Sequence, residues 1–142
     1  MVIRALRRRE ERADYQRMRV ALWPDCGDAD NDGWFARDDA ETFVAARPDG
    51  SLCGFVEVGT RAYAEGCDTS PVGYIEGWYV DPGLRKAGVG RALLDAAERW
   101  ARGRGYSEIA SDALLENTVS HQAHQRCGYA EVERLVAFRK AL

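Results

Sequence analysis

The sequence lacks the features that mark several classes of protein. No apolar run is long enough to cross a bilayer, and the arginines near the N-terminus are not followed by the apolar stretch of a signal peptide. The net charge of −3 argues against a nucleic-acid partner, because such proteins carry a strongly basic face. We therefore expect a cytoplasmic protein with no membrane or nucleic-acid partner, folded as one domain over residues 1–142.

Metal-binding and disulfide patterns are also missing. The four cysteines lie far apart and form no Cys-x-x-Cys pair, which in a cytoplasmic protein favours free thiols over disulfides or zinc. The chain has only two histidines, His121 and His124, three residues apart on a predicted helix. Two such histidines more often face solvent or pack against a neighbour than hold a metal ion. The sequence therefore predicts no metal.

A basic glycine turn between a strand and a helix is the most informative stretch. Pro82 has no N–H and ends the strand, while Gly88 and Gly90 have no Cβ and let a ligand approach the backbone. The following helix directs unpaired N–H groups and the positive end of its dipole at the turn. Such a turn favours a phosphate or pyrophosphate. The alternative is a basic turn that only caps a helix, since the Walker A and dinucleotide motifs are both absent. The turn adds three positive charges, on Arg85, Lys86 and Arg91.

Hydrophobic periodicity predicts an α/β fold. Apolar residues from Val89 to Trp100 recur on one face of a helix that should end around residues 102–105, and the strands before and after it complete a βαβ unit whose two strands should be parallel. Proline and glycine signals divide the rest of the chain. The predicted elements are a strand at 2–6, a helix at 9–22, a helical turn at 38–41, a hairpin over 42–60, strands at 74–80 and 108–111, a helix from 117 to 127, and a closing pair of strands within 131–140.

Two groups of carboxylates stand out, one inside an apolar strand and one in the stretch 25–41. Glu76 interrupts an apolar strand, which is costly unless the carboxylate is paired or faces a wet cleft. Gly77 beside it predicts a β-bulge, and the alternative for Glu76 is a solvated side chain. Residues 25–41 contain seven acidic residues and one arginine. That stretch is either a solvated linker or the rim of a site for a cation.

The motifs taken together resemble the GNAT superfamily of N-acetyltransferases. The resemblance rests on Val80-x-Pro82-x-x-Arg85-x-x-Gly88-x-Gly90, followed by Asn117 and then by Gly128-Tyr129. It implies a mixed central sheet of six to seven strands flanked by about four helices, with acetyl-CoA as co-substrate. It also implies that Asn117 bonds the co-substrate and that the pantetheine arm pairs with the backbone of Trp78, Tyr79 and Val80. The pyrophosphate would bind to the turn, at Arg85, Lys86, Ala87, Gly88, Val89, Gly90 and Arg91.

One position departs from that family pattern. Many members carry a tyrosine seven residues after the asparagine, where it can protonate the departing thiolate. This chain has His124 there. Either the imidazole does this work, or another residue serves, or the thiolate leaves without a dedicated acid.

A narrower resemblance points to the compact, dimeric aminoglycoside 6'-N-acetyltransferases. It implies a homodimer and an antibiotic site lined by Trp23, Tyr63, Glu76, Asp112 and Glu133. Clustered carboxylates suit such substrates, which are polycations. The segments that carry it are Leu22-Trp23-Pro24, the run GCDTSP at 66–71, Glu76-Gly77, Ala110-Ser111-Asp112, Glu116-Asn117-Thr118 and Glu133-Arg134.

The predicted chemistry follows from the acceptor. A protonated amine cannot attack a thioester, so Glu76 is the candidate base, acting directly or through a water. A backbone N–H near Tyr79 or Val80 would polarise the thioester carbonyl, and transfer would be direct. Two alternatives remain open at this point: a different acceptor, such as a polyamine, another small amine or a peptide N-terminus, and a non-catalytic acyl-CoA-binding module.

Overall fold

A computed structural model describes the whole chain, residues 1–142. One five-stranded sheet is flanked by four helices, and none of the helices combines the length and apolar character that crossing a membrane requires. The elements are β1 (Val2–Ala5), α1 (Arg12–Leu22), α2 (Asp30–Phe35), β2 (Glu41–Ala46), β3 (Leu52–Arg61), β4 (Val72–Val80), the short 3-10 helix η1 (Pro82–Leu84), α3 (Val89–Gly103), β5 (Ile109–Ser111) and α4 (Thr118–Arg126).

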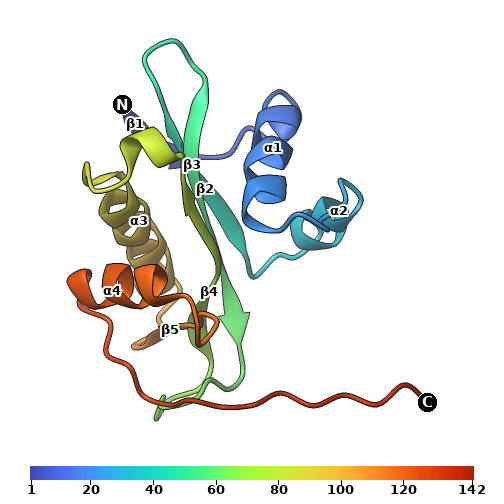
Figure 1. Cartoon of the computed structure of the whole chain (residues 1–142), viewed down its shortest axis with the longest axis vertical. Helices are drawn as coiled ribbons and strands as arrows, with labels where there is room; N and C mark the ends of the chain where they lie inside the picture. The colour runs from blue at the N-terminus through green and yellow to red at the C-terminus, as the bar shows by residue number, and fades with distance from the viewer.

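The strands lie in the order β1-β2-β3-β4-β5, so each pairs with its neighbour in the sequence. β1 to β4 are antiparallel, whereas β5 runs parallel to β4 and is reached through α3. This confirms the predicted βαβ unit. Figure 1 shows α3 and α4 on one side of the sheet and α1 and α2 on the other.

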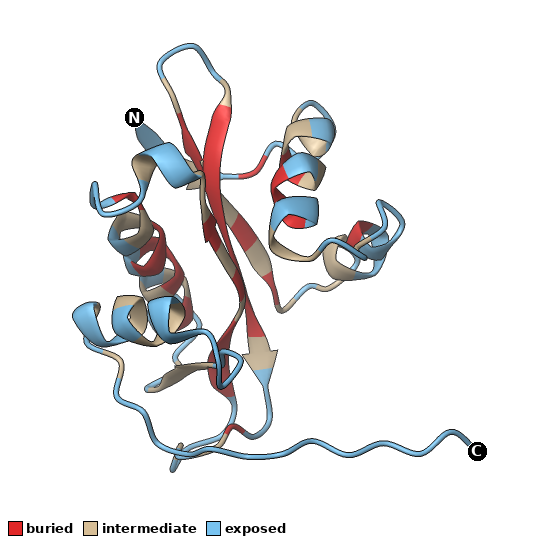
Figure 2. Cartoon of the chain, in the orientation of Figure 1, coloured by how far each residue is buried: buried red, intermediate tan, exposed pale blue.

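Each side of the sheet is covered by one main helix. The apolar face of α3 places Leu93 and Ala97 against the central strands, where both are fully buried. On the other side, Tyr15 and Met18 of α1 are fully buried and pack with Phe55. Figure 2 shows that burial concentrates in β3, β4 and the inner faces of these two helices. The sheet is therefore fixed from both sides at its centre.

The predicted bulge is present, and it displaces Glu76. Glu57 of β3 opposes Gly77 of β4, but the next residue, Val58, opposes Ile75, which leaves Glu76 as the extra residue. β4 also changes its pairing at this point. Only residues 73–75 pair with β5, so residues 76–80 have one edge of the strand open. The bulge and the start of the open edge coincide.

Two predictions about the fold are wrong. Residues 25–41 contain the helix α2 instead of a helical turn at 38–41. The first-turn residues Asp30 and Asp32 suit the helix dipole, and Arg12 pairs with Asp32 and with Asp28 just before the helix. The closing pair of strands within 131–140 is absent, so the sheet has five strands and not six to seven. That segment contains no Gly, Pro, Asn or Asp to reverse the chain, and it runs as one extended segment away from the domain (Figure 1).

Candidate active site

A cavity of about 520 Å³ opens on the α1 and α2 side of the sheet. Its walls combine aromatic rings with charges of both signs, and Glu76 of the bulge is one of the lining residues. Asp30 places part of the acidic stretch 25–41 in the cavity lining. This favours the prediction that the stretch borders a site for a cation over the prediction that it is a solvated linker. The lining residues are Arg19, Trp23, Asp30, Gly33, Trp34, Arg37, Glu57 and Glu76.

The floor of the cavity is a buried and internally paired carboxylate. Glu57 is only 2% exposed and accepts a short hydrogen bond from the Tyr15 hydroxyl. Arg19 Nε lies 2.8 Å from Glu57 Oε1, so the two side chains form an ion pair. The Nε–H bond does not point at the carboxylate, and Arg19 Nε therefore makes no hydrogen bond. Burial raises the pKa of Glu57 above its ordinary value, although Arg19 acts against this. Sequence reasoning missed Glu57, although it interrupts an apolar strand as Glu76 does and could have been found by the same signal.

Glu76 is joined to Asp112 through two side chains that the sequence did not single out. Both carboxylate oxygens of Glu76 accept hydrogen bonds from Arg61, at 2.9 Å each. The Arg61 guanidinium lies 3.6 Å from the centroid of the Tyr74 ring. The Tyr74 hydroxyl donates to Asp112 Oδ2 at 2.6 Å. The structure therefore brings together two of the predicted substrate carboxylates.

Trp23 lines the cavity with its aromatic ring. It follows the last residue of α1, and its ring packs against Phe55, with 6.4 Å between ring centroids. The edge of the indole also lies over Gly77, where a Cβ would come within 2.5 Å of Trp23 Cη2. Only glycine at position 77 lets the indole lie this close to the bulge.

The two remaining predicted substrate residues lie apart from this cavity. Tyr63 is 68% exposed in the loop after β3. Glu133 lies on the extended C-terminal segment and is also exposed. Of the five predicted substrate residues, Trp23 and Glu76 line the cavity, Asp112 is linked to Glu76 through Tyr74 and Arg61, and Tyr63 and Glu133 do neither.

The basic turn presents a row of free backbone donors. No backbone N–H from Lys86 to Arg91 donates a hydrogen bond within the chain, and α3 has no side-chain cap at its N-terminus. Lys86 and Gly88 both have positive φ, of 64° and 88°, which curls the backbone in front of the helix. Consecutive N–H groups in such a curl form an anion-binding concavity. This is the geometry that a pyrophosphate requires.

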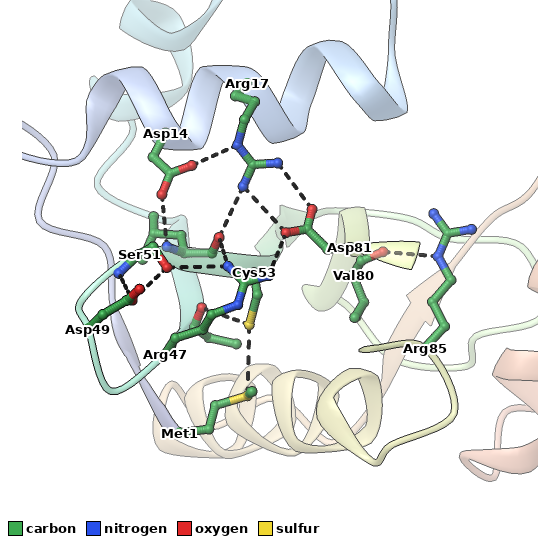
Figure 3. Close-up of polar contacts among 12 residues, drawn as sticks. Met1, Asp14, Arg17, Arg47, Asp49, Ser51, Cys53, Val80, Asp81 and Arg85 are labelled. Atoms are coloured by element: carbon green, nitrogen blue, oxygen red, sulfur yellow. Dashed lines mark hydrogen bonds and ion pairs between the residues drawn. The ribbon is translucent and has the colours of Figure 1, made fainter. Parts of the chain in front are cut away.

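The start of this turn is fixed by a charged cluster at the end of β4 (Figure 3). Asp81 accepts hydrogen bonds from Arg17 and Arg47, each at 3.1 Å. Burial raises the pKa of Asp81, but these two hydrogen bonds outweigh it, and the net pKa lies below the ordinary value. Arg85 donates from Nε to the Val80 carbonyl at 2.9 Å, so it also holds the turn against the strand.

The open edge of β4 contains Trp78, Tyr79 and Val80, which pair with β3 on one side only. The Asp81 N–H donates to Cys53 on that β3 side. Because successive N–H groups alternate between the two edges of a strand, the Val80 N–H lies on the open edge. A linear amide-containing molecule can therefore extend the sheet here.

Two residues near α4 are already engaged within the chain. Asn117 caps the helix, with its Oδ1 accepting from the Ser120 N–H at 3.2 Å, while its Nδ2 makes no hydrogen bond. His124 Nδ1 lies 2.7 Å from the Ser120 carbonyl, and its Nε2 lies 2.8 Å from Ser111 Oγ. Because a carbonyl only accepts, Nδ1 carries a proton, and in the neutral ring Nε2 accepts from the Ser111 hydroxyl.

The comparisons with known proteins identify this arrangement. The model of the acetyltransferase (GNAT) family matches residues 5–129. The chain belongs to this family. An aminoglycoside N(6')-acetyltransferase type 1 of Klebsiella aerogenes is 45% identical over 138 residues, covering 92% of this chain and 90% of the relative. Another of the same name from Stenotrophomonas maltophilia is 44% identical over 133 residues, covering 92% and 87%.

Solved structures of aminoglycoside 6'-N-acetyltransferases superimpose on nearly the whole chain. The aminoglycoside 6'-N-acetyltransferase AAC(6')-Ih from Acinetobacter baumannii superimposes with a TM-score of 0.92 at 31% identity, covering 99% of this chain and 98% of that one. The enzyme AAC(6')-Iy, in complex with the bisubstrate analogue CoA-S-monomethyl-acetylneamine, gives a TM-score of 0.91 at 36% identity, with the same coverage. As a GNAT acetyltransferase, this chain uses acetyl-CoA, which the free N–H groups of the turn and the open edge of β4 fit.

Proposed function

We propose that this protein transfers the acetyl group of acetyl-CoA to the 6'-amine of an aminoglycoside, and that it thereby inactivates the antibiotic. The observation that carries the proposal is the position of Glu76, which lines an aromatic and acidic cavity at the residue where the edge of β4 opens. The relatives named for this activity span nearly the whole chain and support the same acceptor.

The co-substrate binds along two neighbouring features. Its pyrophosphate accepts hydrogen bonds from the N–H groups of Lys86 to Arg91, and the side chains of Arg85 and Arg91 add charge. The pantetheine arm pairs with the open edge at residues 78–80, and Asn117 bonds it from α4. The uncapped start of α3 and the unpaired edge support this assignment.

The acceptor binds on the other side of the sheet. Trp23 flanks a sugar ring, and Glu76 and Asp112 bind ammonium groups. Tyr63 and Glu133, which are exposed outside the cavity, contact the part of the acceptor that projects from it. Several charge-assisted hydrogen bonds in one cleft suit a polycation better than a substrate with a single amine.

Glu76 accepts a proton from the 6'-ammonium, which frees the amine to attack the thioester carbonyl. The Val80 N–H donates to the developing oxyanion, since it is the backbone donor on the open edge. The tetrahedral intermediate then breaks its C–S bond, the thiolate takes the second proton of the attacking nitrogen and leaves as the thiol, and no acyl-enzyme forms. Cys67 and Cys127 have raised pKa values because of burial, which does not suit a nucleophile.

The test is turnover of acetyl-CoA with kanamycin, tobramycin, spermidine and an aminoglycoside that carries a 6'-hydroxyl. We expect turnover with the two 6'-amino drugs and none with the 6'-hydroxyl compound. A Glu76→Gln variant should lower kcat about 10²- to 10⁴-fold and leave acetyl-CoA binding unchanged. Turnover with spermidine alone would reject the antibiotic and leave the family assignment intact.

We further propose that the enzyme is a homodimer in the cytoplasm, where acetyl-CoA is produced and used. The C-terminal segment supports a dimer, because its apolar side chains are exposed in the single chain and a second copy could bury them. Phe138 is 92% exposed and Val136 is 71% exposed. A chain ending at Ala130 should elute as a monomer in light scattering, and the full chain as a dimer. A monomeric full chain would reject this proposal.

A further inference from the structure

Glu76 is already bound to a cation that belongs to the protein. Arg61, the last residue of β3, donates from Nε to Oε1 and from Nη2 to Oε2 of Glu76, both at 2.9 Å. This is the two-point pairing of a guanidinium fork with a carboxylate. An incoming ammonium group therefore meets a carboxylate whose two oxygens are both already bound to the Arg61 guanidinium.

The position of Arg61 also relates it to the second substrate carboxylate. Its guanidinium lies over the Tyr74 ring, and Tyr74 donates to Asp112. The pKa of Arg61 is raised, chiefly by its hydrogen bond to Glu76, and Asp112 contributes to the same shift. One protein cation therefore interacts with both carboxylates that the proposed function assigns to the acceptor.

The two arginines that line the cavity, Arg19 and Arg37, are paired with other carboxylates. Arg19 is buried and pairs with Glu57, and Arg37 pairs with Asp39 while lying over Trp34. Arg61 is different because its side chain remains 42% exposed. Because Arg61 and Glu76 both reach solvent, water screens the pair, and a polycation that contacts several carboxylates can compete with Arg61 for Glu76.

We propose that Arg61 is a tethered substitute for the acceptor's ammonium group: it occupies Glu76 in the free enzyme and is displaced when the acceptor binds. This inference rests on the proposed function and deepens it. A single amine only exchanges one cation for another at Glu76, which gains little. A polycation also gains contacts at Asp112 and at the acidic rim. Arg61 therefore selects for acceptors with several charges.

The experiment measures kanamycin binding by calorimetry together with KM and kcat. Arg61→Gln removes the competing cation and should lower both Kd and KM for kanamycin about three- to fivefold. Arg61→Lys keeps the charge and should stay near the wild-type values. A similar gain should appear for a monoamine of the same sugar ring, because it too no longer competes with Arg61. Arg104→Gln is the matched control: it also removes one positive charge from an arginine stacked on an aromatic ring, Trp100, outside the site.

If the wild-type enzyme acetylates kanamycin but Arg61→Gln binds kanamycin no more tightly than the wild type, this inference is overturned and the proposed function stands. A fall in kcat without tighter binding would mean that Arg61 only positions Glu76, and would also overturn it. If Arg61→Gln does not fold, tighter binding in Arg61→Lys than in the wild type would overturn it instead. If the wild-type enzyme acetylates no aminoglycoside, the proposed function and this inference both fail.

Discussion

Replacing Gly77 with alanine tests the link between the bulge and the aromatic wall of the cavity. The added Cβ would lie 2.5 Å from Trp23 Cη2 and 3.1 Å from Phe55 Cε2. Carbon atoms prefer separations of about 3.5–4.0 Å, so a neighbour has to move by about 1 Å. Phe55 is fully buried and has no room, whereas Trp23 lies at the cavity and can move. We expect Trp23 to swing into the cavity.

The size of the effect follows from the packing. Overpacking of this kind costs about 1–3 kcal/mol, and for a domain of this length each kcal/mol lowers Tm by about 2–4 °C. Gly77→Ala should therefore lower Tm by about 2–12 °C in a thermal scan. Because Trp23 then intrudes on the acceptor's space, KM for kanamycin should rise several-fold while KM for acetyl-CoA stays the same.

Gly103→Ala is the control for this substitution. Gly103 ends α3 at ordinary φ, and no atom lies within 4 Å of an added Cβ, so this variant should be as stable as the wild type or slightly more stable. A Gly77→Ala protein with wild-type Tm and wild-type KM for kanamycin would refute the reasoning. It would mean that the bulge and the indole are not in contact in solution.

Three further predictions follow from other contacts. The folded-state pKa of Asp81 is lowered, so its stabilising contribution is full above the unfolded pKa of about 3.9 and is lost as pH falls through the folded value. Asp81→Asn should therefore flatten the fall of Tm below about pH 4; an unchanged slope would contradict this. Gly88→Ala, at φ 88°, should raise KM for acetyl-CoA several-fold without changing KM for kanamycin, as steady-state kinetics would reveal. Tyr15→Phe leaves buried Glu57 with one donor fewer and should cost about 1–3 kcal/mol in urea unfolding.

The sequence was sufficient for those parts of the fold that depend on local periodicity. The α3 face, the strand before it and the turn between them all carry strong signals, and the structure confirms them. The helix α2 was missed because it has only six residues and no apolar stripe. The closing strands were predicted from apolar residues alone, yet pairing also requires a turn and an available neighbour, which the segment lacks within its own chain.

Part of the candidate site was predictable for a similar reason. Glu76 stands out because a carboxylate in an apolar strand needs an explanation, and Gly77 correctly indicated the bulge. Arg61 carries no such signal, since an arginine at the end of a strand is ordinary. The register places Arg61 opposite Val72, and its long side chain then passes over Tyr74 to reach Glu76. Contacts between strands of this kind emerge only from the folded sheet.

The division of the helices between the two faces of the sheet has a kinetic consequence. The cavity is bounded by α1 and α2, whereas the basic turn leads into α3 on the opposite face (Figure 1). With the acceptor in the cavity and acetyl-CoA on the turn, as proposed above, the two reactants would enter from different directions and meet where β4 separates from β5. Neither reactant blocks the entry of the other, so both can be bound at once. Double-reciprocal plots should therefore intersect instead of running parallel, and acetyl-CoA incubated alone with the enzyme should leave no acetyl group on the protein.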